Sequence, residues 1–81
     1  MQQLLIITPV KDSIDHTVRT MEAVVQSELN VPHRYVVFND NSTPENTARL
    51  HTEAARLGVE VVDLAGKYFF PFFNIFTFFY L

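Results

Sequence analysis

The sequence predicts an α/β domain of strand–helix–strand–helix–strand order with a parallel three-stranded sheet. Three apolar runs rich in β-branched residues, at 4–8, 35–39 and 59–64, alternate with two segments whose apolar residues have helical spacing. The connections are only a few residues long. Such an alternation predicts right-handed crossovers between parallel strands.

The first strand and helix are predicted from the run "LLIIT" at 4–8 and the apolar spacing between 14 and 29. A continuous apolar run is typical of a strand covered on both faces, and we expect Pro9 to end it. We expect the helix to span roughly 14–29. Asp12 or Ser13 can cap its first free N–H groups.

The second strand, at 35–39, is followed by the polar segment "NDNSTPENT", where a second helix is predicted to begin. Two N-caps are open: Ser42 in a capping box with Glu45, or Thr43 with Pro44 at the first helical position. The helix is expected to end near Leu57, with the following glycine as a left-handed stop. The third strand is predicted at 59–64.

The bulk composition excludes several classes of function. The 81 residues hold one domain at most, and 48% hydrophobic with 19% charged residues is typical of a globular protein. A net charge of −3 and the lack of a basic patch argue against nucleic acid as a partner. The chain has no cysteine and no recognisable signal peptide, so a cytoplasmic location is expected.

Ligands of open parallel sheets bind beyond the carboxyl ends of the strands, which makes "TPVKD", "NDNST" and "DLAGK" the segments of interest. Asp40 can accept hydrogen bonds from a ribose hydroxyl or a base, or it can simply support the turn and the helix cap. Lys11 can meet a phosphate or remain a solvated surface residue. A glycine-rich phosphate loop is absent, and the three histidines lack metal-ligand spacing.

The segments "IITPVKD" and "VVFNDNSTPENT" resemble the amino-terminal part of family 2 glycosyltransferases, which have the GT-A fold. The family pattern is an apolar strand ending in "PVYN", a helix, and a strand ending in "DDGSTD" or "DDNS". The resemblance covers about residues 3–64. It implies a partial Rossmann-like GT-A domain at 1–65 that binds a nucleotide sugar of the UDP or GDP type.

The resemblance also implies the residues of the nucleotide site. The family's "PVYN" loop matches Pro9, Val10, Lys11 and Asp12, and the acid that contacts the base matches Asp40. Lys11 replaces the family's aromatic residue, which removes a stacking surface. Family members transfer a sugar to an acceptor hydroxyl, using an acid pair that holds Mg²⁺ or Mn²⁺ and a later acid as the base.

Neither the acid pair nor the base has a counterpart here, because Asp63 is the only acid after residue 60. We therefore expect a truncated, inactive nucleotide-binding fragment with no catalytic residue and no metal of its own. The alternative is a non-enzymatic interaction module. A small sheet with open edges can also associate with itself.

The tail at 66–81 has a different composition, since seven of the eight phenylalanines lie between Phe69 and Phe79. It is too short for a transmembrane helix, and Pro71 falls near its start. Three interpretations remain: an unrelated tail from a shifted reading frame, an aromatic anchor that contacts a membrane or a partner, or a segment that packs on the exposed sheet.

Overall fold

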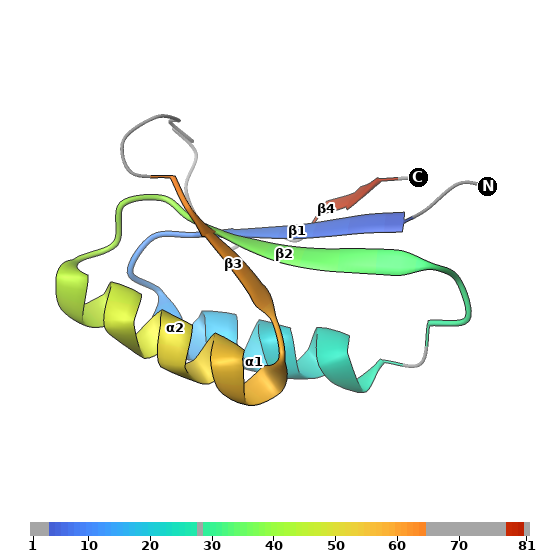
Figure 1. Ribbon diagram of the computed structural model, residues 1–81, viewed down its shortest axis with the longest axis horizontal. Coiled ribbons are helices and arrows are strands. Elements are labelled where there is room, and N and C mark those ends of the chain that lie inside the picture. Colours follow the sequence, from blue (N-terminus) through green and yellow to red (C-terminus); the bar gives the residue numbers. More distant parts are fainter. Residues whose placement is uncertain (1–3, 28, 65–77, 81) are drawn as a thin grey trace.

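The computed structural model describes residues 4–27, 29–64 and 78–80, and it confirms the predicted order of strands and helices. The elements, shown in Figure 1, are β1 (Leu4–Val10), α1 (Ile14–Gln26), β2 (His33–Asn39), α2 (Pro44–Leu57), β3 (Glu60–Asp63) and β4 (Phe78–Tyr80). The predicted strand–helix–strand–helix–strand unit corresponds to β1 through β3. Most of the tail, at 65–77, lies outside the described residues, and so do the predictions made for it.

The sheet has the strand order β3-β2-β1-β4. β1, β2 and β3 are parallel, as predicted, with Leu4 opposite His33 and Val10 opposite Asn39 in the register of the first pair. β4 was not predicted; it pairs antiparallel with β1, so that Leu5 lies opposite Tyr80. The described chain is thus an α/β unit compatible with part of a Rossmann-like fold.

Both helices pack on the same face of the sheet (Figure 1). Two successive right-handed crossovers that run in the same direction place their helices on one side. On the other face Leu5 and Ile7 remain partly exposed. The buried core lies between the sheet and the helices and consists of Val10, Ile14, Met21, Val37, Leu50 and Ala54.

Pro9 does not end the first strand, because β1 continues through it to Val10. The N–H of Leu4 and the C=O of Val10 both bond toward the β2 side, so the alternation of the strand directs Pro9 toward the β4 side. There β4 extends only as far as the position opposite Ile7. The missing N–H of Pro9 therefore costs no ladder hydrogen bond.

The ends of the other elements follow local capping chemistry. α1 ends at Gln26, three residues earlier than predicted, because Ser27 is extended and its hydroxyl donates to the carbonyl of Val24 at 2.6 Å. α2 begins after Thr43, whose hydroxyl accepts from the N–H of Asn46, so the second of the two predicted caps is the one that forms. Gly58, which follows α2, has a left-handed backbone, as predicted.

The bounds of two strands differ slightly from the prediction. β2 begins two residues earlier than predicted, and β3 is shorter by one residue at each end.

Candidate functional site at the carboxyl ends of the strands

The loops that follow β1 and β2 lie side by side at one edge of the sheet. Val10 is opposite Asn39 in the register, and the N–H of Asp40 donates to the carbonyl of Val10 at 2.8 Å. Parallel strands end at the same edge, so the two predicted site segments are brought together. The structure thereby places Asp40 directly beside the end of β1.

Asp40 is buried, with 4% of its surface exposed. One oxygen of its carboxylate accepts a hydrogen bond from the side-chain amide of Asn41 at 2.9 Å. Within the described part of the chain no second partner of this carboxylate is found, and the helix cap belongs to Thr43 instead. The carboxylate is thus held in place and keeps capacity to accept further hydrogen bonds.

Asp12 bridges the two loops rather than capping α1. Its carboxylate accepts from the N–H of Thr43 at 2.8 Å and from the side-chain amide of Asn46 at 3.1 Å. Its own N–H donates to the hydroxyl of Ser42 at 2.8 Å. Ser13 occupies the N-cap position of α1 but makes no side-chain cap bond. The expectation that Asp12 or Ser13 caps α1 through its side chain is therefore wrong.

The contacts of Asp12 have an electrostatic consequence. The hydrogen bond from the N–H of Thr43, followed by that from Asn46, lowers the pKa of the Asp12 carboxyl below its ordinary value. The backbone of Asp12 is left-handed, with φ of 62°, which aspartate tolerates better than most residues. The N-terminus of α2 also favours a negative charge. Asp12 thus remains ionised and stabilises the start of α2.

The other three predicted site residues, Pro9, Val10 and Lys11, differ in how accessible their side chains are. The side chain of Val10 is fully buried in the core, and Pro9 is buried as well, so these two residues shape the loop. Lys11 is exposed. Among the described residues it forms no ion pair, which leaves its ammonium group free for an anion.

A second group of polar side chains, which the sequence reasoning missed, joins the ends of β2 and β3 to α2. The side-chain amide of Asn39 donates to Thr47 at 3.0 Å and to Asp63 at 2.8 Å, and its oxygen accepts from the N–H of Ser42 at 3.3 Å. His51 approaches the other oxygen of Asp63 at 2.7 Å. Partial burial raises the pKa of Asp63, but the bonds from Asn39 and His51 outweigh it, so the net direction is downward.

We call these bonded residues the strand-end cluster: Asp12, Asn39, Ser42, Thr43, Asn46, Thr47, His51 and Asp63. A shallow cavity of about 260 Å³ opens on it, lined by Asn39, Asn41, Ser42, Thr47 and Asp63. The residues on either side of Asp40 line this cavity, but Asp40 itself does not. The sequence held one signal for the cluster, the polar residues Asn39 and Asp63 that end β2 and β3, but only the sheet register brings these two residues together.

The described residues offer no ligand set for a divalent metal. Among the described residues, no three histidine or acidic side chains come together closely enough to hold a metal ion.

No helix in the described ranges has the length and apolar character needed to cross a membrane.

No protein-family model, no curated protein and no solved structure matches this chain. The structure by itself defines an α/β protein whose polar candidate site lies at the carboxyl ends of a parallel sheet.

Proposed function

We propose that this chain binds the nucleotide part of a nucleotide sugar of the UDP or GDP type, as the nucleotide half of a glycosyltransferase-like domain. The observation that carries the proposal is Asp40: a buried carboxylate at the end of an interior strand, with one side-chain hydrogen bond and capacity for more. A carboxylate in this position accepts hydrogen bonds from the N–H groups of a base or from ribose hydroxyls.

Lys11 supplies the second part of the proposed site. It lies in the loop after β1, directly after Val10, whose carbonyl accepts from the N–H of Asp40, and it is exposed. A lysine ammonium binds phosphate as a point charge. Asp12 plays an indirect part, because its bonds to Ser42 and Thr43 hold the Lys11 loop against the loop that carries Asp40.

Calorimetric titration of the full chain with UDP, GDP and uridine tests the proposal. Asp40→Asn keeps the size of the side chain but replaces a charged acceptor, and we expect UDP or GDP affinity to fall about tenfold or more. Asp15→Asn is the matched control, since it removes the same charge from an exposed position on α1. We expect it to leave affinity unchanged.

Lys11→Ala separates the phosphate from the nucleoside. It is expected to weaken UDP by a larger factor than uridine, because uridine has no phosphate for the ammonium group to bind. Circular dichroism of each variant confirms that it is folded. The proposal is wrong if UDP and GDP fail to bind, or if they bind tightly and are indifferent to both Asp40→Asn and Lys11→Ala.

A further inference from the structure

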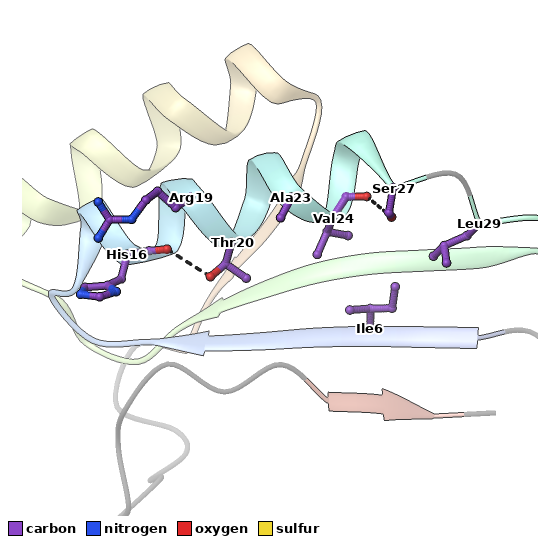
Figure 2. A pocket seen from close by; sticks show the side chains of 8 residues that line it. All are labelled: Ile6, His16, Arg19, Thr20, Ala23, Val24, Ser27 and Leu29. Carbon is purple, nitrogen blue, oxygen red and sulfur yellow. Dashed lines mark hydrogen bonds between the residues drawn. The ribbon is translucent and has the colours of Figure 1, made fainter.

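A groove runs along α1 on the side away from α2, above β1, and nothing in the proposed nucleotide site uses it. Its volume is about 510 Å³, within the range of small-molecule sites. Figure 2 shows its walls: Ile6 points up from β1 while Thr20 and Val24 point down from α1. We call this feature the α1 groove.

One end of the α1 groove is apolar. Ile6, Ala23, Val24 and Leu29 line it, and Ile6 at its floor is only 1% exposed. The hydroxyl of Thr20 donates to the carbonyl of His16 at 3.1 Å, and that of Ser27 to Val24. Both hydroxyl protons are donated to backbone carbonyls of the same helix segment, so these two side chains have no proton left to donate to a ligand.

The other end is basic. Arg19 and His16 lie together there, toward the carboxyl end of β1 (Figure 2). Arg19 has no ion-pair partner among the described residues, whereas the neighbouring Asp15 is bonded to Arg49 at 2.8 Å. The charge of Arg19 acts on Asp15 only as a smaller influence after the bond to Arg49, so the permanently charged guanidinium keeps its N–H groups for a bidentate anion.

A groove with one apolar end and one basic end suits an amphipathic anion. We propose that the α1 groove binds a carboxylate with an unbranched apolar tail, of the fatty-acid type. The carboxylate pairs with Arg19, with His16 beside it, and the tail runs along Ala23 and Val24 toward Leu29, above the floor that Ile6 forms. The helical positions from His16 to Ser27 span about 16 Å at 1.5 Å per residue, so a tail of medium length fits.

Binding of three probes with the same tail tests the charge requirement. Dodecanoate, dodecanol and dodecyltrimethylammonium are titrated into the full chain below their aggregation limits, with amide NMR shifts and calorimetry as readouts. We expect dodecanoate to bind most tightly and to shift the amides of 16–27. Arg19→Gln is expected to weaken dodecanoate about tenfold and to leave dodecanol unchanged. Arg34→Gln, at an exposed arginine of β2 that pairs with Glu60 away from the groove, is the charge-matched control.

A blocking variant tests the location. Ala23 is exposed and lines the groove, so Ala23→Phe fills the groove without disturbing the core and is expected to weaken dodecanoate at least about tenfold. Ala55→Phe, at an exposed alanine of α2, is the matched control and should have no effect. Arg19→Gln keeps the test decisive if Ala23→Phe fails to fold.

Equal binding of the three probes, unchanged affinity in both Arg19→Gln and Ala23→Phe, or no binding of dodecanoate at all would each overturn the proposal. The test is independent of the nucleotide site, because UDP binding and its dependence on Asp40 are measured separately.

Discussion

The strand-end cluster and the α1 groove differ in how their polar groups are used. In the cluster the amide of Asn39 and the carboxylates of Asp12 and Asp63 are bonded to neighbouring protein groups. In the groove the guanidinium of Arg19 has no partner among the described residues. Polar residues gathered at a strand end can therefore serve the fold first. The side chains of Asp40, Lys11 and Arg19 differ because they keep capacity for further hydrogen bonds.

The largest effect is expected from Asn39→Ala. Asn39 is 3% exposed and makes three hydrogen bonds through its side chain, so the variant leaves the N–H of Ser42 and one oxygen of Asp63 without partners. We expect a loss of about 3 kcal/mol in the free energy of unfolding, measured by urea denaturation. Asn30→Ala, at an exposed position, is the control. A loss no larger than that of the control would show that the cluster does not stabilise the fold.

A smaller loss is expected from Asp12→Ala. It removes two hydrogen bonds at the start of α2 and places alanine at a positive φ, which together should cost about 2 kcal/mol. Asp12→Asn keeps an acceptor oxygen and tolerates the left-handed backbone, so it should lose less. Equal losses for the two variants would show that neither the acceptor oxygen nor the left-handed preference that asparagine keeps stabilises the start of α2.

The pH dependence of stability separates the charge of Asp12 from its hydrogen bonds. Because the folded state lowers its pKa, the carboxylate contributes stability above the unfolded value of about 3.9, and this contribution is lost as the pH falls through the folded-state pKa. Urea denaturation at neutral and acidic pH should therefore show a smaller loss on acidification for Asp12→Asn than for the unmodified chain. Identical losses would contradict the assignment.

The smallest effect on stability is expected in the groove. Ala23→Phe and Arg19→Gln change exposed positions of α1, and neither removes a hydrogen bond or an ion pair found among the described residues. Their free energies of unfolding should stay within about 0.5 kcal/mol of the unmodified chain. Thermal or urea denaturation checks this. A large loss in either variant would mean that the groove belongs to the folding core, and the contrast with the strand-end cluster would disappear.

Much of the fold could be predicted because its determinants are local. Apolar periodicity gave the order from β1 to β3, and Thr43, Pro44 and Gly58 mark the two ends of α2 through the chemistry of their own backbones. The placement of both helices on one face could not be derived from a single apolar run. That placement depends on the direction of successive crossovers, which is a property of the whole sheet.

The candidate site was predictable only in part, for a related reason. The position of Asp40 at a strand end follows from the strand itself, so the sequence located it. The partners of Asp12 are about thirty positions away in the sequence, and nothing in the loop after β1 indicates that its carboxylate binds the start of α2. The register pairing of Asn39 with Asp63 likewise exists only in the assembled sheet.

The antiparallel pairing of β4 with β1 has a consequence for the order of folding. β1 and β2 are joined by one short crossover, whereas β1 and β4 lie at opposite ends of the sequence, and closing that loop costs more entropy. The N–H groups of β1 alternate between its two neighbours, so those of Leu5 and Ile7 are directed toward β4 and that of Ile6 toward β2. Hydrogen exchange at adjacent residues of one strand thus reports two separate events. We expect protection at Ile6 to report the pairing of β1 with β2, and protection at Leu5 and Ile7 to report the pairing with β4 and to arise later.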